Sequence, residues 1–152
     1  MESLRLISTV ICDDVLRNPG GWLSLYTLFR EVYADAYPTT LVRMHVVATW
    51  LNESAQTRQV IQRVAVLSPE GELVADQAAT VDVAPDAYHT QITRFLDTVF
   101  VAPGTYRVQV QAGTDIVADL PLFLMPPTSE TVKGPVLSAS TGSAQVLPKE
   151  EP

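Results

Sequence analysis

The sequence predicts an all-β fold, an antiparallel β-sandwich of about eight strands. Three observations predict it. Apolar residues recur at every second position, and turn-forming dipeptides interrupt them at intervals of about 8–15 residues. The composition, 47% hydrophobic and 18% charged, suits a packed core and is too apolar for a disordered chain. Only Asp13–Arg17 shows helical periodicity, and it is too short for more than one helical turn.

Two segments show the alternation most clearly. Residues 41–50 place apolar side chains on one face and polar ones, including His45, on the other. In residues 104–113, Tyr106, Val108 and Val110 alternate with polar residues in the same way. Segments rich in β-branched and aromatic residues predict six further strands: Leu4–Ile11, Leu23–Phe29, Val60–Leu67, Leu73–Thr80, Thr90–Phe100 and Ile116–Leu124.

Turn residues separate these segments. Asn18–Gly21 reads Asn-Pro-Gly-Gly, and Ser68–Glu72 reads Ser-Pro-Glu-Gly-Glu, so each predicts a tight turn between two strands. Pro103-Gly104 and residues 112–115 predict two more. Pro121 lies inside the last apolar segment, and its missing N–H predicts an edge strand or a bulge there.

The composition divides the chain into a β-sandwich domain, residues 1–125, and a tail, residues 126–152. The tail is rich in Pro, Ser and Thr and has no aromatic residue. Such a segment buries too little apolar surface to offset its chain entropy. We therefore expect a flexible, disordered tether, or a segment that folds only on a partner.

Charge and cysteine content exclude several classes of function. Ten Lys and Arg face 17 Asp and Glu, for a net charge of -7, and no basic run offers a surface for nucleic acid or an anionic membrane. Cys12 is the only cysteine, so neither an intramolecular disulfide nor a cysteine zinc site is possible. The N-terminus lacks the features of a secretory signal, and no apolar run approaches the ~18 residues of a membrane span. We expect a soluble, cytoplasmic protein.

Three segments resemble a family of small bacterial proteins of unknown function. They are VICDDVLRNPGGWLSLYTLFREV, VLSPEGELV and APGTYRVQVQAG, and they carry an Ile-Cys-Asp and a Gly-Gly-x-Leu-Ser-Leu signature. The resemblance covers most of residues 1–125 and none of the tail. The resemblance implies an immunoglobulin-like or C2-like sandwich, and it implies no activity.

Adjacent carboxylates after Cys12 form the first candidate site. Asp13 and Asp14 stand at the end of a predicted strand, where they could bind a divalent cation with the help of Asp86 or Asp115 from other loops. The alternative is that they accept backbone N–H bonds in a turn. That alternative is favoured, because the spacing of a calcium loop is absent and calcium needs six or more oxygen ligands.

Aromatic residues around the second strand form another candidate site. With acidic neighbours, they would suit a recognition surface for a basic partner or a sugar. A place in the core or at a corner is the favoured alternative for each ring, as it is for Tyr106. Only for Tyr33 and Tyr37, in a loop with Pro38, are exposure and burial equally expected. The four residues are Trp22, Tyr26, Tyr33 and Tyr37.

Enzymatic chemistry finds no support in the motifs. Cys12 with His45 or His89 is the only possible thiol nucleophile set, and a buried cysteine usually acts as a small apolar residue. No GxSxG, HExxH, Walker or GxGxxG motif occurs. We therefore expect no enzyme, no cofactor and no resident metal.

The prediction for function is a non-enzymatic β-sandwich interaction module. It would bind a protein partner, or a second copy in a homo-oligomer, through a sheet edge or face, because sandwiches have open edges that pair readily. The alternative is a domain that binds a small ligand or a divalent cation through its loop carboxylates.

Overall fold

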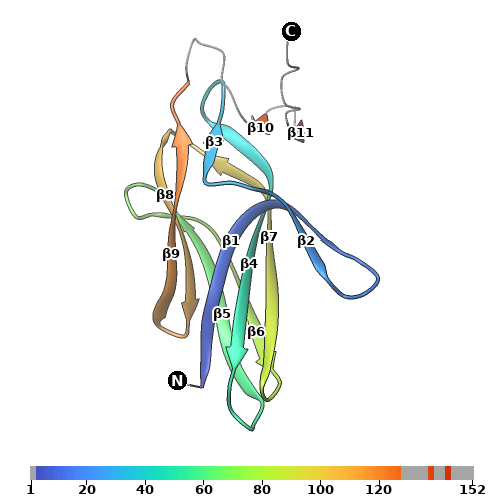
Figure 1. The fold of residues 1–152 in the computed structure, drawn as a ribbon. Coiled ribbons are helices and arrows are strands. Elements are labelled where there is room, and N and C mark those ends of the chain that lie inside the picture. Colours follow the sequence, from blue (N-terminus) through green and yellow to red (C-terminus); the bar gives the residue numbers. More distant parts are fainter. Residues whose placement is uncertain (1–2, 128–136, 139–142, 145–152) are drawn as a thin grey trace.

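The computed structural model describes residues 3–127, 137–138 and 143–144. Within these residues the chain forms strands and no helix, and two sheets pack face to face (Figure 1). This confirms the all-β sandwich. The strands of the sandwich are β1 (Leu4–Arg17), β2 (Leu23–Leu28), β3 (Glu31–Tyr33), β4 (Thr39–Asn52), β5 (Arg58–Leu67), β6 (Leu73–Val83), β7 (Ala87–Phe100), β8 (Gly104–Ala112) and β9 (Asp115–Met125).

The first sheet has the order β2-β1-β4-β7 and the second the order β3-β9-β8-β5-β6. Neighbouring strands are antiparallel except for β3 and β9, where Glu31 lies beside Phe123 in a parallel pair. This short pair is the one parallel exception, among the described strands, in the predicted antiparallel sandwich. Phe29 and Arg30 carry the chain from the first sheet to the second, and β3 then runs in the direction of β9.

All eight predicted strands are present, and most are longer than predicted. The structure adds a ninth strand to the sandwich, β3, which was not predicted. It has only three residues, too few for side-chain alternation to reveal it. The segment Asp13–Arg17 forms no helical turn, because it continues β1. Its backbone groups pair with β2 down to the Arg17–Leu23 pair, and this ladder outweighs a weak local helical preference.

The core lies between the two sheets. Met44, Val46 and Trp50 of β4 face it, as the alternation predicts. The opposite face of β4 is not the polar surface that was expected, since His45 is only 5% exposed. Because β4 lies between β1 and β7, His45 is flanked by Cys12 of β1 on one side and Arg94 of β7 on the other.

A tyrosine corner marks the crossing from β7 to β8. The Tyr106 hydroxyl donates a 2.7 Å hydrogen bond to the carbonyl of Ala102, and the buried ring meets Phe100 edge-on at 4.9 Å. Such a tyrosine at a corner between the two sheets is typical of immunoglobulin-like sandwiches. This confirms the expected role of Tyr106, and with the strand order it identifies the sandwich as immunoglobulin-like.

Pro121 lies where β9 has a neighbour on one side only. It pairs with Arg107 of β8, whereas β3 joins β9 only from Phe123 onward. Strand β9 is therefore not the edge strand that was predicted, because β3 lies outside it. The part of β9 that contains Pro121 is nevertheless open on one side, where a residue without an N–H is tolerated. The predicted turn at Ser68–Glu72 is confirmed, with the Gly71 N–H donating to the Ser68 carbonyl and a φ of 88° at Gly71.

Most of the predicted tail lies outside the described residues. Beyond Pro127 the structure describes only β10 (Leu137–Ser138) and β11 (Ser143–Ala144), which pair with each other. No helix in the described part of the chain is long and apolar enough to cross a membrane.

Candidate functional site

Asp13 and Asp14 lie where β1 leaves β4 and pairs with β2. Arg43 of β4 binds both carboxylates, with Nη2 at 2.9 Å from Asp13 Oδ2 and 3.8 Å from Asp14 Oδ2. The Arg43 Nε also donates to the Asp13 carbonyl at 3.0 Å. The hydrogen bond to Asp13 raises the pKa of the Arg43 guanidinium. The two carboxylates therefore bind the side chain of Arg43, and the contact of Asp13 with Arg43 joins β1 to β4.

The structure does not bring the other two predicted carboxylates to this place. Asp86 lies in the turn between β6 and β7, where its N–H donates to the Ser54 carbonyl. Asp115 begins β9, beside Ala112. Among residues 3–127, no three His, Cys, Asp or Glu side chains gather in a way that would hold a metal ion.

Cys12 and His45 are paired neighbours on β1 and β4. The thiol is fully buried, and burial, followed by the charges of Asp13 and Asp14, raises its pKa to about 11. His45 Nδ1 lies 3.0 Å from the Asp13 carbonyl, and since a carbonyl only accepts, Nδ1 is the donor. His89 lies elsewhere, opposite Trp50, and its Nε2 is 3.0 Å from Gln91 Oε1. The thiol is protonated at neutral pH.

Tyr33 and Tyr37 are both half-buried. The Tyr33 hydroxyl donates to Glu31 Oε1 at 2.7 Å, which raises the pKa of the Tyr33 phenol. The Tyr37 hydroxyl donates to the Met125 carbonyl at 2.6 Å, and burial raises its pKa. Tyr37 therefore ties its loop to the end of β9, whereas Tyr33 lines a cavity.

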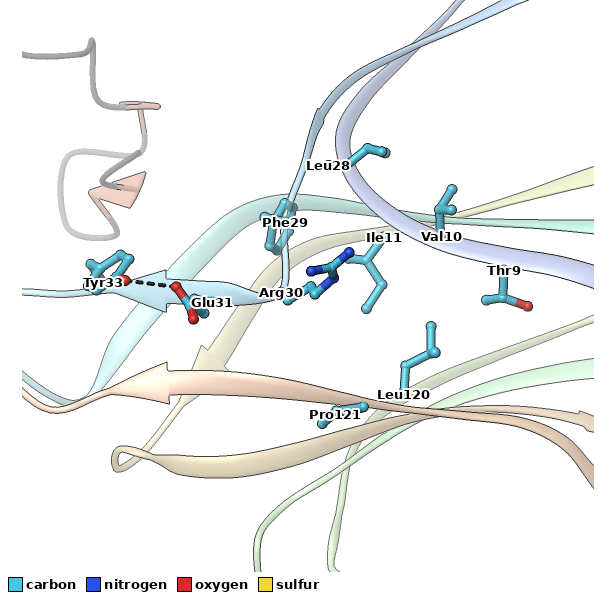
Figure 2. Close-up of a pocket in the computed structure, with 10 residues that line it drawn as sticks. All are labelled: Thr9, Val10, Ile11, Leu28, Phe29, Arg30, Glu31, Tyr33, Leu120 and Pro121. Atoms are coloured by element: carbon cyan, nitrogen blue, oxygen red, sulfur yellow. Dashed lines mark hydrogen bonds between the residues drawn. The ribbon is translucent and has the colours of Figure 1, made fainter. Parts of the chain in front are cut away.

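That cavity lies on the side of the sandwich where β1 and β9 face each other, and it measures about 670 Å³ (Figure 2). Its walls are mainly apolar, and the link between β2 and β3 covers one end. Thr9 Oγ1 is the one buried side-chain polar atom, among the described residues, without a hydrogen-bond partner. The lining residues are Thr9, Val10, Ile11, Leu28, Phe29, Arg30, Glu31, Tyr33, Leu120 and Pro121.

The hairpin of β1 and β2 projects from the sandwich as an arm, residues 14–28 (Figure 1). One face of the arm is apolar and exposed: Leu16 is 54%, Trp22 75% and Tyr26 47% exposed. The preference for core or corner positions is therefore wrong for Trp22 and Tyr26. The alternation could not reveal this, because the arm has strand periodicity but no sheet packed against this face.

The tip of the arm is held in one conformation. The Asn18 side chain accepts a 3.0 Å hydrogen bond from the Trp22 N–H, and the Asn18 N–H donates to the Trp22 carbonyl. Gly21 has a φ of 86°, which favours glycine. At Gly20 a Cβ would come within 3.0 Å of the Trp22 ring, so the indole packs over this glycine.

The sheet edges differ in how they are protected from pairing. Proteins block edges with charges, prolines, bulges, short strands or a covering segment. On β7, the Gln77 side chain of β6 donates to the Arg94 carbonyl, and Asp97 has a φ of 54°. Strand β6 carries Asp76 and Asp82. Each of these two edges therefore has a feature that opposes a further strand.

The remaining edges also differ in whether they carry a feature that opposes pairing. On the open part of β9, Pro121 supplies no N–H, and β3 has only three residues. The open part of β1 has a bulge between Leu6 and Ser8. Strand β2, the first strand of its sheet, has six residues and neither a charge nor a proline. Its one residue in the left-handed region, Thr27 with a φ of 55°, is next to its last residue, so residues 23–26 remain a regular open edge. Among the edges that the structure describes, β2 is the least protected.

A family comparison covers nearly all of the sandwich. Residues 7–125 match the model of DUF6941, a family of unknown function. The chain belongs to the DUF6941 family. The match ends at the close of β9, so the matched range contains the residues of the arm and of the cavity, and Asp13 and Arg43. No curated protein matches this DUF6941 chain.

Solved structures share the fold of the DUF6941 domain at low sequence identity. The alkylpurine DNA glycosylase AlkC from Pseudomonas fluorescens is 9% identical with a TM-score of 0.52, over 80% of this chain and 30% of that one. A β-glucosidase from Listeria innocua is 14% identical with a TM-score of 0.50, over 82% and 16%. The chain thus spans less than a third of the length of either enzyme. These likenesses show the fold alone.

An immunoglobulin-like protein from Pseudomonas aeruginosa is similar over nearly its whole length. It is 15% identical, with a TM-score of 0.45, over 80% of this chain and 96% of that one. The immunoglobulin-like character of the DUF6941 domain rests on its own strand order and on the corner made by Tyr106.

Proposed function

We propose that this chain is a non-enzymatic interaction module that binds a protein strand along the β2 edge of its arm. The observation that carries the proposal is the lack of protection on β2. A strand of six uncharged residues, Leu23–Leu28, ends the first sheet, and an unpaired edge of this kind is a template for a further strand.

The side chains of the arm support the same function. Trp22 and Tyr26 are residue types that dominate binding energy in protein interfaces, and both stand exposed beside Leu16. The fixed turn from Asn18 to Trp22 presents the indole in a set position. A partner would therefore lose little free energy in ordering the arm.

The proposal includes the absence of catalysis and of a cofactor. It is supported by Cys12, whose buried thiol is protonated at neutral pH, and by Asp13, which is engaged with Arg43. A net charge of -7 favours a protein partner over nucleic acid or an anionic membrane. We further propose a bacterial source and a cytoplasmic location, since a buried free thiol suits a reducing compartment.

Photo-crosslinking tests the β2 edge directly. The full chain carries a photoreactive phenylalanine analogue in place of Tyr26, or, as the control, in place of Tyr88, which is exposed on β7. We expect one discrete protein adduct at position 26 in cells, identified by mass spectrometry, and none at position 88. Adding Leu25→Pro should remove it. Equal adducts at both positions, or an adduct that survives Leu25→Pro, would contradict the proposal.

The cavity favours a second candidate function, the binding of a small ligand. Its walls, including Ile11, Phe29 and Leu120, suit an apolar molecule, while Arg30 and the unpartnered Thr9 hydroxyl suit a carboxylate. Ligand-observed NMR with medium-chain fatty acids and the matched alcohols tests this. We expect the acids to bind more tightly and Leu120→Trp, which fills the cavity, to abolish binding; signals unchanged by Leu120→Trp would exclude the site.

A further inference from the structure

The backbone of β2 shows which of its groups face outward. At the turn, the Asn18 N–H donates to the Trp22 carbonyl, so Trp22 points its backbone groups toward β1. Because these groups alternate in direction along a strand, those of Ser24 and Tyr26 also point toward β1. The N–H and C=O groups of Leu23 and Leu25 then point away from β1, where the first sheet ends.

The usable length of this edge is short and well defined. Gly21, with a φ of 86°, bounds it at one end, and Thr27, with a φ of 55°, bounds it at the other. Residues 23–26 between them form regular strand. An added strand therefore finds four outward hydrogen-bonding groups, two on Leu23 and two on Leu25.

We propose that a second copy of this chain occupies this edge, so that two arms pair as antiparallel β2 strands about a two-fold axis at Ser24. The inference rests on the proposed function and names its partner. In this register Leu23 pairs with Leu25 of the second copy, and all four outward groups are used. With the axis at Leu23, Leu25 would have to pair with Gly21 of the second copy. With the axis at Leu25, Leu23 would have to pair with Thr27 of the second copy. Neither Gly21 nor Thr27 is in the extended conformation.

The same register brings the aromatic rings together. Trp22, Ser24 and Tyr26 share one face because side chains alternate along a strand. With Ser24 opposite itself, Trp22 of one copy lies opposite Tyr26 of the other, twice. Directly opposed aromatic pairs stabilise antiparallel strands. Trp22 is the most exposed large apolar residue of the described chain, and Tyr26 is exposed as well.

Charge favours a second copy at this place. The chain has a net charge of -7, so most of its surfaces repel those of another copy. Between Val15 and Leu28 the only charged residue is Arg17. The arm also projects from the sandwich (Figure 1), which keeps the acidic bodies of the two copies apart. The arm is therefore the part of the surface where two copies approach with the least repulsion.

A charge exchange at the two-fold axis tests the proposal. Ser24→Lys places two lysines opposite each other, and Ser24→Asp places two aspartates there, so each variant should dimerise at least about fivefold more weakly than wild type. A one-to-one mixture of the two should form a heterodimer with the affinity of wild type or better. Sedimentation velocity on the full chain measures all three. Thr80→Lys on β6 is the matched control and should leave the dimer unchanged.

A disulfide gives a second readout that does not depend on affinity. Ser24→Cys places two thiols at a directly opposed pair, within reach of a disulfide, and the buried Cys12 does not compete. We expect a covalent dimer on mild oxidation, and none from Thr80→Cys. Dimers of wild-type affinity in both charged variants would overturn the β2 register. The wild type could instead be monomeric at high concentration while position 26 still crosslinks a different protein. That result would overturn the proposal that the partner is a second copy, and it would leave the proposed function standing.

Discussion

The Arg43 guanidinium holds the Asp13 carboxylate at 2.9 Å, and its Nε also donates to the Asp13 carbonyl at 3.0 Å. This contact joins β4 to β1 at the residue where β1 stops pairing with β4 and continues into the arm. His45 donates to the same carbonyl. Two side chains of β4 therefore hold the base of the arm against the body of the sandwich.

We predict that Arg43→Ala lowers the free energy of unfolding by about 1–3 kcal/mol, because it removes hydrogen bonds to a largely buried carboxylate and to a buried backbone carbonyl. Urea denaturation followed by tryptophan fluorescence measures it. Arg63→Ala is the control: its ion pair with Asp76 is half-exposed and should contribute at most about 1 kcal/mol. Equal losses in both variants would mean that the base of the arm is not held by this contact.

A buried polar pair between the sheets gives a second prediction. The Trp50 indole N–H donates to Gln62 Oε1 at 2.8 Å, and Gln62 is almost fully buried. Gln62→Leu should destabilise the domain by about 1–3 kcal/mol, because it leaves the indole N–H without an acceptor. Trp50→Phe in the Gln62→Leu background should cost less than Trp50→Phe alone. Additive losses in this double-mutant cycle would show that the two side chains act independently.

The corner formed by Tyr106 gives a third prediction. Tyr106→Phe keeps the ring against Phe100 and removes the hydrogen bond to the Ala102 carbonyl. We expect a loss of about 1 kcal/mol, which corresponds to a melting temperature lower by about 3–5 °C for a domain of this size. Tyr88→Phe, at an exposed position, should leave the melting temperature unchanged. A Tyr106→Phe variant as stable as wild type would show that the corner adds no stability.

The burial of Cys12 predicts a pH dependence. Its pKa rises from 9.0 to about 11 in the folded chain, so above pH 9 the thiol of the unfolded chain ionises before that of the folded chain. Stability from this group is therefore complete below pH 9 and is lost as the pH rises toward 11, by at most about 1.4 kcal/mol per pH unit. The stability of wild type relative to Cys12→Ala should fall over this range, and a constant difference would contradict the prediction.

The same burial predicts slow chemistry at the thiol. At pH 8, iodoacetamide should modify native Cys12 far more slowly than the same thiol in urea, because the thiolate is the reactive form and burial keeps it protonated. Mass spectrometry of timed samples measures this. Thr80→Cys provides an exposed thiol on β6 for comparison. Equal rates at the two positions would mean that Cys12 is accessible in the native state.

The alternation of apolar and polar residues predicted side-chain burial correctly where only one face of a strand packs against the rest of the domain. Residues 104–113 show it almost without exception, and β8 lies there with Tyr106 and Val108 facing the core. It predicted burial wrongly where the neighbouring strands of the same sheet decide the burial. His45 looked like a surface residue because its own segment alternates, yet β1 and β7 flank it on both sides. Burial of a central strand depends on strand order, which local periodicity does not contain.

The candidate site shows the same limit. Asp13 and Asp14 were recognised as a pair with a structural or a ligand role, but the sequence contained no sign that Arg43, thirty residues away, would bind them. Trp22 and Tyr26 were recognised as an aromatic group, and the favoured interpretation placed them in the core. Their exposure follows from the arm, which continues β1 past the edge of the sandwich.

The sequence by itself determined the sandwich, its strands and its turns, because side-chain alternation and the conformations of Gly and Pro are local properties. It also determined the acidic charge and the single thiol. The tertiary structure decided which edges are protected, which carboxylates meet an arginine, and which apolar residues remain outside. These properties arise from contacts between segments distant in the chain. For that reason the uncharged strand β2 became the proposed binding edge only when the structure placed it at the end of a sheet.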